Sequence, residues 1–309
     1  MLKFGWRVPD FPVDGSNAAV FRDQQFAFLD AFQPHLDSAW VADHFLPWMA
    51  TWDQSGATFE CWTTLTYLCA KYPKLDFGTI VMSQGYRPPA LLAKMGAVLQ
   101  TLSGGRFILG IGAGWKENEY LSYGYDFPAP AVRIHQLEEA VQIIRGMWTQ
   151  PKTTFHGKYY HVDEAICQPM PNPRPPIMIG GSGRKLTLRA VAKYADWWNG
   201  VGCSVEEMQE SLKVLAAHCH EVGRDPASIV PTLSTDCVAV AGSTQEAQRM
   251  AQSSHFYSPA GLIGNPDEVA AQIQRYVDLG VQHFILRFVD YPRFDGAALF
   301  VKEVLPRFR

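Results

Sequence analysis

The chain has 309 residues, of which 47% are hydrophobic and 18% are charged, and its formal net charge is −3. This is the composition of a globular protein that buries a sizeable core without disulfides or metal ions. The near-neutral charge and the lack of long Lys/Arg runs argue against nucleic acid or an anionic membrane surface as the main partner.

Three further features bear on the compartment. The first residues lack the apolar stretch and cleavage site of a signal peptide. No run approaches 18 uninterrupted apolar residues, so no membrane span is predicted. The six cysteines are scattered without a CxxC pair, as is typical of reduced thiols, and they do not indicate a metal site. We therefore expect a cytoplasmic protein with no membrane partner and no bound metal.

The hydrophobic period switches repeatedly between that of a strand and that of a helix. In the first half, strands are predicted at 4–8, 38–44, 75–82 and 106–111, and helices at 23–34, 60–72, 89–102 and 133–148. In the second half, strands are predicted at 176–179, 196–199, 229–240 and 283–288, and helices at 184–194, 205–222, from 244 onward and at 266–279. Eight strands alternating with helices predict an α/β fold, a (β/α)8 TIM barrel, because a doubly wound sheet usually stops near six strands.

Two stretches fit neither a helix nor a barrel strand. Residues 150–167 are aromatic and polar, and 169–176 carry five prolines. Residues 254–264 are also irregular. Long irregular segments in compact domains often serve as lids or binding loops. We expect one domain over 1–309 with insertions in its loops, the largest at about 150–175.

The carboxyl ends of the strands are the working face of such a barrel. The second strand ends in Asp43 and His44. A histidine there is able to hold a proton near neutral pH, and its aspartate neighbour to orient it. The alternative interpretation is a loop pair that caps the next helix. Position alone does not separate the two.

Glycines follow two other strands. Gly110, Gly112 and Gly114 allow either a ligand or another backbone to approach closely, and the spacing alone leaves both open. The segment 180–187 opens a helix with glycines, a hydroxyl and two cations. Such a helix start favours an anion cradle over a plain turn. It is not a Walker motif, because a leucine follows the lysine.

Four tryptophans fall near the predicted working face, where flat aromatic walls suit a planar ring system. They are Trp40, Trp48, Trp52 and Trp115.

Several runs, in order along the chain, resemble the luciferase-like monooxygenase superfamily. They are WVADHF (40–45), LSGGRFILGIGAGW (102–115), PPIMIGG (175–181) and YADWWN (194–199). The resemblance implies a (β/α)8 barrel that uses either reduced FMN with oxygen or coenzyme F420 in hydride transfer. The run at 102–115 and HCHEVGRDP at 218–226 are similar to the F420-dependent oxidoreductase subgroup.

We therefore expect an enzyme that transfers a hydride between F420 and a small organic substrate. The alternatives are an FMN-dependent monooxygenase that uses O2, and a barrel that binds a ligand without turnover. The resemblance also implies a homodimer.

Carried over to this chain, the resemblance assigns catalysis to His44, with Asp43 orienting it and lying beside the cofactor ring. It assigns cofactor contacts to Thr79, Ile80 and Val81 at the third strand end, where relatives carry a non-prolyl cis peptide, here Ile80–Val81.

The resemblance adds Asn118 as a contact to the cofactor and a phosphate cradle at Gly180, Gly181, Ser182 and Gly183. One position departs from the pattern. Some sugar-phosphate dehydrogenases of the family place a catalytic glutamate where this chain has Trp115, which makes sugar phosphates unexpected substrates. Glu117 and Glu119 are the acids able to substitute.

Overall fold

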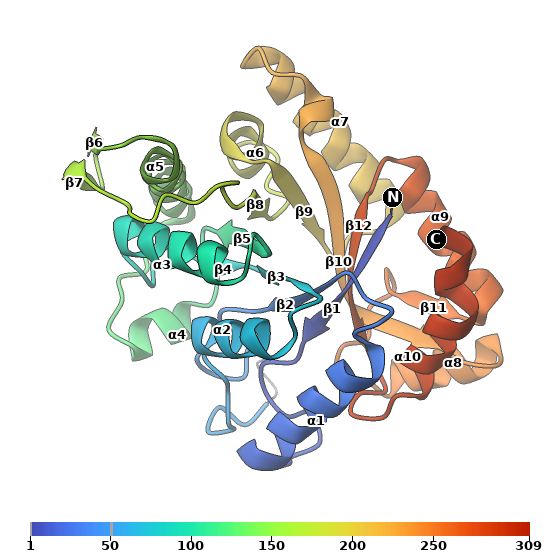
Figure 1. The fold of residues 1–309 in the computed structure, drawn as a ribbon. Helices are drawn as coiled ribbons and strands as arrows, with labels where there is room; N and C mark the ends of the chain where they lie inside the picture. Colours follow the sequence, from blue (N-terminus) through green and yellow to red (C-terminus); the bar gives the residue numbers. More distant parts are fainter. Residues whose placement is uncertain (1, 50–51) are drawn as a thin grey trace.

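The computed structural model describes residues 2–49 and 52–309. Strands gather at the centre and helices surround them (Figure 1). The strands are β1 (Lys3–Val8), β2 (Ser38–Val41), β3 (Asp76–Thr79), β4 (Met82–Ser83), β5 (Phe107–Gly112), β6 (Thr153–His156), β7 (His161–Ala165), β8 (Ile177–Gly180), β9 (Trp197–Val201), β10 (Val230–Val240), β11 (Leu262–Gly264) and β12 (His283–Phe288). The α-helices are α1 (Ala18–Phe32), α2 (Cys61–Lys71), α3 (Pro89–Leu102), α4 (Glu117–Ser122), α5 (Pro130–Thr149), α6 (Thr187–Tyr194), α7 (Val205–Glu221), α8 (Thr244–Gln252), α9 (Pro266–Asp278) and α10 (Asp295–Leu299).

The central strands form a closed parallel barrel. Hydrogen-bonded neighbours follow the order β1, β2, β3, β5, β8, β9, β10, β12, and β12 pairs with β1 again. The short strands β4 and β11 add to β5 and β10. The predicted (β/α)8 barrel is confirmed.

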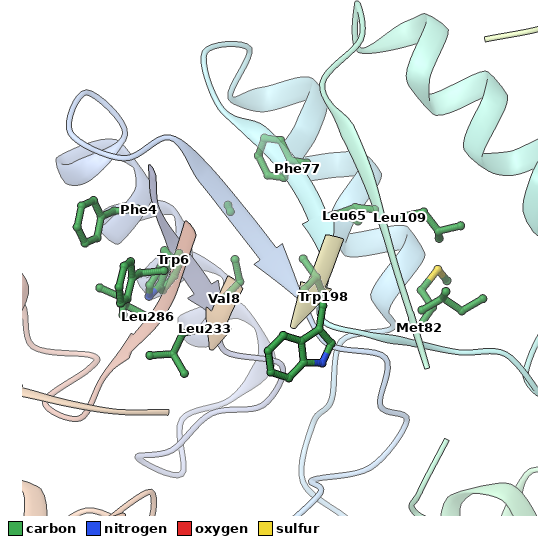
Figure 2. Close-up of a cluster of buried hydrophobic side chains, with 14 of the residues drawn as sticks. Phe4, Trp6, Val8, Leu65, Phe77, Met82, Leu109, Trp198, Leu233 and Leu286 are labelled. Carbon is green, nitrogen blue, oxygen red and sulfur yellow. The ribbon is translucent and has the colours of Figure 1, made fainter. Parts of the chain in front are cut away.

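The strands read as continuous apolar runs because both of their faces are buried. Every residue of β5 and β12 is buried, as expected for a parallel sheet covered by helices. Figure 2 shows part of the larger apolar cluster, in which Phe4 and Trp6 of β1 lie with Leu233 of β10 and Leu286 of β12. A smaller cluster around Trp40, with residues from β5, β8 and β12, fills the barrel interior.

Trp40 requires a glycine on the neighbouring strand. A Cβ atom added to Gly78 would collide with the six-membered ring of Trp40, which is fully buried. Gly78→Ala should therefore destabilise the fold by about 1–3 kcal/mol, the usual cost of overpacking a core. Gly242→Ala is the matched control, because the nearest atom to its added Cβ is 3.9 Å away. Thermal denaturation of both variants checks this; equal melting temperatures would contradict the packing described for Trp40.

Side-chain caps set the start of several helices. Ser204 with Glu207, and Asn265 with Glu268, form capping boxes before α7 and α9. Asn17 accepts from the first amides of α1. Among the helices in the described ranges, none combines the length and apolar composition needed to cross a membrane.

The structure differs from the predicted elements in several places, including a first helix that begins at Ala18, a second strand that ends at Val41, the strand β11 within the stretch predicted to be irregular, and the unpredicted helix α10. The third strand is split into β3 and β4 around Ile80–Val81, a cis peptide. The helix predicted from residue 184 begins at Thr187, because the glycine-rich run before it favours a turn over helix nucleation. The segment 150–175 contains an antiparallel hairpin of β6 and β7. The short helix α4 was not predicted, and it carries a residue of the candidate site.

Candidate active site

The carboxyl ends of the barrel strands enclose a cavity of about 460 Å³. Because the strands are parallel, the segments that follow them meet at this one end, where active sites of the fold lie. Residues from seven of the barrel strands or the loops after them contribute to its wall. The lining residues are Arg7, Asp43, His44, Trp48, Ile80, Val81, Met82, Ser83, Tyr86, Gly112, Ala113, Gly114, Trp115, Lys116, Glu119, Pro130, Arg133, Ile134, Gly180, Gly181, Thr187, Val201, Ser234 and Asp236.

His44 and Glu119 form a hydrogen-bonded pair in this wall. Nδ1 of His44 lies 2.9 Å from Oε2 of Glu119. Oε1 of Glu119 accepts hydrogen bonds from the backbone amides of Phe45 and Leu46, each at 3.0 Å. One carboxylate on α4 therefore fixes both the ring of His44 and the loop that carries it.

Glu119 is fully buried, yet it is held in the charged form. Burial raises the pKa of Glu119, but the hydrogen bond and charge of His44 and the two loop amides lower it, and the resulting pKa lies below the ordinary value. The hydroxyl of Tyr86 donates to Oε2 at 3.3 Å. Burial and the charge of Glu119 raise the pKa of Tyr86, so it stays protonated at neutral pH. Because Glu119 accepts the Nδ1 proton, neutral His44 presents an acceptor at Nε2.

The contacts of Asp43 correct its predicted role in orienting His44. Its side chain is fully buried and binds Arg87 through both oxygens, at 2.9 and 3.1 Å. The backbone amide of Ser83 donates to the same carboxylate at 2.9 Å. Burial raises the pKa of Asp43, while Arg87 opposes this shift. Asp43 thus links the end of β2 to the segment after β3. The residue that contacts and orients the ring of His44 is Glu119.

Val81 enters the cavity wall because the neighbouring strands carry glycines. A Cβ on Gly112 or Gly180 would lie 2.8 or 2.9 Å from the methyl groups of Val81. Ile80 and Val81 line the cavity, and the cofactor contacts that the resemblance assigns to them stay a prediction. Thr79 lies deeper: its hydroxyl donates to the carbonyl of Gly110 at 2.7 Å and accepts from its amide at 2.9 Å. It joins β3 to β5 and is outside the described cavity lining.

Two of the four tryptophans singled out from the sequence flank His44. The ring centroids of Trp48 and Trp115 lie 6.1 and 5.7 Å from that of His44. Trp115 is 62% exposed, so much of its ring is open to ligand or solvent. Trp40 belongs to the barrel interior, and Trp52 packs edge-on against His255 with centroids 4.5 Å apart.

Only the first part of the predicted phosphate cradle reaches the cavity. Gly180 and Gly181 line it together with Thr187, the first residue of α6. Ser182 and Gly183 are exposed and lie outside the lining. The amide of Gly181 already donates to the carbonyl of Asn199 at 3.2 Å.

Asn118, also predicted as a cofactor contact, points elsewhere. It is exposed, and its amide nitrogen lies 3.4 Å from Oε1 of Gln54. Its neighbour Glu119 is the residue of α4 that enters the cavity wall. Glu117 and Glu119 were the two acids able to substitute for the glutamate that Trp115 replaces. Glu117 is exposed, and Glu119 is the one that lines the cavity.

Several charged residues of the site have no signal in the sequence. Lys116 and Arg133 line the cavity, and neither forms an ion pair with a carboxylate of the described residues. Lys116 donates to the carbonyl of Trp48 at 3.0 Å, and Arg133 donates to the carbonyl of Pro128. Arg7 and Asp236 lie within strands predicted to be core. Their pairing depends on which strands become neighbours, and a single sequence does not show that.

The pair of His44 and Glu119 is suited to proton transfer. The imidazole exchanges a proton with a bound molecule through Nε2, and the buried carboxylate stabilises the imidazolium that results. Within the described residues, no group of three or more His, Cys, Asp or Glu side chains is arranged to hold a metal ion.

Comparison with known proteins places the chain among characterised relatives. A family model described as luciferase-like monooxygenase matches residues 33–261. The F420-dependent glucose-6-phosphate dehydrogenase of Amycolatopsis mediterranei (strain U-32) is 27% identical over 89% of this chain and 90% of its own length. The F420-dependent hydroxymycolic acid dehydrogenase of Mycobacterium tuberculosis is 31% identical over 75% of this chain and 62% of its own length.

A solved structure has the same fold along the whole chain. It is an F420-dependent secondary alcohol dehydrogenase in complex with an F420–acetone adduct, and it is 21% identical with a TM-score of 0.83. The two chains cover 100% and 99% of each other.

Proposed function

Because this chain belongs to the luciferase-like monooxygenase family, we propose that it is an oxidoreductase that transfers a hydride between coenzyme F420 and a small organic substrate. The observation that carries the proposal is the His44–Glu119 pair in the cavity wall, which supplies the proton transfer that accompanies hydride transfer to or from a carbonyl group. The F420-dependent dehydrogenases among the relatives support the same cofactor.

The cavity residues fit an anionic cofactor with a planar ring. Ile80 and Val81 would contact the ring, and Gly180, Gly181 and Thr187 would lie at its phosphate. Lys116 and Arg133 add positive charge without a carboxylate partner among the described residues, which suits a phosphate and its acidic tail. When bound, the cofactor supplies the ring carbon that accepts or donates the hydride.

The protein's own contribution is proton transfer and positioning. In the oxidation of an alcohol, His44 accepts the hydroxyl proton at Nε2 as the carbonyl forms, and Glu119 stabilises the charged ring. In the reverse direction, the same nitrogen returns the proton. Trp48 and Trp115 lie beside His44 and help to hold its ring in position.

Titration with F420 and with FMN tests the cofactor. Quenching of the fluorescence of F420, and of FMN in a parallel titration, should show saturable binding of F420 in preference to FMN. Arg133→Ala should weaken F420 binding by about tenfold, because it removes one charge-assisted contact. Tight binding of FMN alone would favour an O2-dependent monooxygenase, and binding of neither would favour a barrel without turnover.

We also propose that the chain works as a homodimer in the cytoplasm, on a small molecule and not on nucleic acid. An apolar groove between α2 and α3, lined by Trp62, Met95, Val98 and Leu102, supports an interface there. Leu102 is 80% exposed in the single chain. The six unpaired, buried cysteines suit a reducing compartment. Sedimentation analysis of the wild type and of Leu102→Glu tests the dimer.

A further inference from the structure

We propose that Arg7 and Asp236 form the substrate-recognition end of the cavity, and that they select an uncharged substrate carrying a second hydroxyl group. This inference rests on the proposed function. Both residues line the cavity together with Ser234. Arg7 comes from β1, and Asp236 and Ser234 come from β10.

The order of the strands gives the cavity two ends with His44 between them. Strands β10, β12 and β1 are neighbours, and β1 pairs with β2, which His44 follows. On the other side of β2 lie β3, β5 and β8, which lead to Ile80, Val81 and Gly180. If the cofactor occupies the β3–β5–β8 side, the substrate has to approach His44 from the side of Arg7 and Asp236.

A local irregularity places Asp236 in the cavity. The pairing of β10 with β12 shifts its register between Thr235 and Val238. Such a bulge re-aims side chains, and bulges are common beside active sites. The Asp236 side chain is 21% exposed, and Oδ2 accepts a hydrogen bond from Nη1 of Arg7. A carboxylate offers about four acceptor positions. Oδ1 is buried beside Arg287, so the position that we assign to a substrate hydroxyl is on Oδ2.

The ring of Trp48 lies close both to Arg7 of this pair and to His44. The guanidinium carbon of Arg7 lies 5.6 Å from the centroid of the Trp48 ring. The same ring lies 6.1 Å from that of His44. Arg7, Asp236, Trp48 and His44 therefore line one cavity, and in the proposed complex one substrate hydroxyl lies at His44 and the other at the Arg7–Asp236 pair.

The charges at this end balance, which argues against an anionic substrate. Arg287 lies 3.3 Å from Asp10 and 3.2 Å from Asp236, the latter as an ion pair without hydrogen-bond geometry. With Arg7, the cluster contains two cations and two anions. A phosphate or carboxylate would meet no excess positive charge here, in contrast to the end with Lys116 and Arg133. A neutral hydroxyl would meet an acceptor in Asp236 and a donor in Arg7.

The reaction on such a substrate balances without another reagent. The carbinol C–H bond breaks and its hydride passes to F420, the O–H proton passes to Nε2 of His44, and the C=O bond forms. The second hydroxyl stays bound to Asp236 and is unchanged. The Arg7–Asp236 pair therefore selects the substrate and adds no chemical step.

The test compares three probes with F420 and purified enzyme: 1,2-propanediol, 2-propanol and glucose 6-phosphate. The wild type should oxidise the diol with the highest kcat/KM and glucose 6-phosphate with the lowest. Asp236→Asn should lower kcat/KM for the diol by about 10- to 100-fold, mainly through KM, because it removes a charged hydrogen-bond acceptor. The loss for 2-propanol should be smaller, and discrimination against the phosphate should weaken, because Arg7 becomes uncompensated.

Asp10→Asn is the matched control. Asp10 belongs to the same charge cluster but is 1% exposed and lies outside the described cavity lining. It should retain the wild-type ratio of diol to 2-propanol oxidation. An equal change of this ratio in both variants would overturn the inference. So would a wild-type preference for glucose 6-phosphate, or F420 binding without oxidation of either uncharged probe.

Two further results are also decisive. If Asp236→Asn does not fold, the comparison of probes on the wild type decides alone. If F420 does not bind to the wild type, the proposed function fails, and this inference fails with it.

Discussion

His44→Ala is expected to lower kcat for alcohol oxidation by about 100- to 10,000-fold, the range typical of general acid–base catalysis. The variant loses the nitrogen that accepts the substrate proton, while the residues around the proposed cofactor position remain. F420 affinity, measured by fluorescence quenching, should therefore stay close to that of the wild type. Initial rates of F420 reduction, followed by absorbance, give kcat.

His135→Ala is the control for this prediction. The side chain of His135 is 50% exposed on α5 and pairs with Glu138; it lies outside the described cavity lining, although its neighbours Arg133 and Ile134 belong to that lining. It should leave kcat unchanged. Normal turnover by His44→Ala would remove the catalytic assignment, and a parallel loss of F420 binding would show that His44 acts through the cofactor site instead.

Glu119→Gln is expected to lower kcat about 10- to 100-fold, the usual effect of losing a group that orients a catalytic or metal-bound histidine. The amide cannot accept from His44 and from the loop amides in the same way, and it does not stabilise the imidazolium. Glu119→Asp, which keeps the charge, should recover part of the rate. Glu117→Gln, an exposed change on the same helix, should have no effect. A loss of stability with unchanged kcat and pH profile would make Glu119 structural only.

The lowered pKa of Glu119 also predicts a pH dependence of stability. Its ordinary value is 4.5, and its value in the folded protein lies below this. The stability that it contributes is therefore fully present above pH 4.5 and is lost as the pH falls through the lower folded value. The difference in unfolding free energy between the wild type and Glu119→Gln should shrink in that range. A difference independent of pH would contradict a charged Glu119.

The barrel was predictable because its strands are apolar runs that can be identified locally in the sequence. Eight such runs alternate with helices, which is the number that a (β/α)8 barrel needs. The pattern at 283–288 coincides with β12, and the long amphipathic run at 133–148 lies within α5. The third strand was predicted as one piece, since its apolar pattern continues across Ile80 and Val81 while the backbone changes direction there. Helix α4 was missed because six residues carry too little periodicity to identify a helix.

The site was only partly predictable, because hydrogen bonds between distant segments decide it. Position after a strand indicated His44, and the resemblance indicated Val81. The partner of His44 lies 75 residues away on a helix without a sequence signal. Asp43 is the natural partner by its position in the sequence, but a single sequence does not show which cation a buried carboxylate meets in the fold. The carboxylate of Asp43 forms its ion pair with Arg87 instead.

The proposed reaction transfers a hydride directly from the substrate to F420. It is tested most directly by oxidising 2-propanol that carries deuterium at its carbinol carbon, without oxygen. Acetone and reduced F420 should form in equal amounts, and the deuterium should be recovered in the reduced F420. Reduced F420 that carries only hydrogen from solvent, or a product that forms only with FMN and O2, would contradict it.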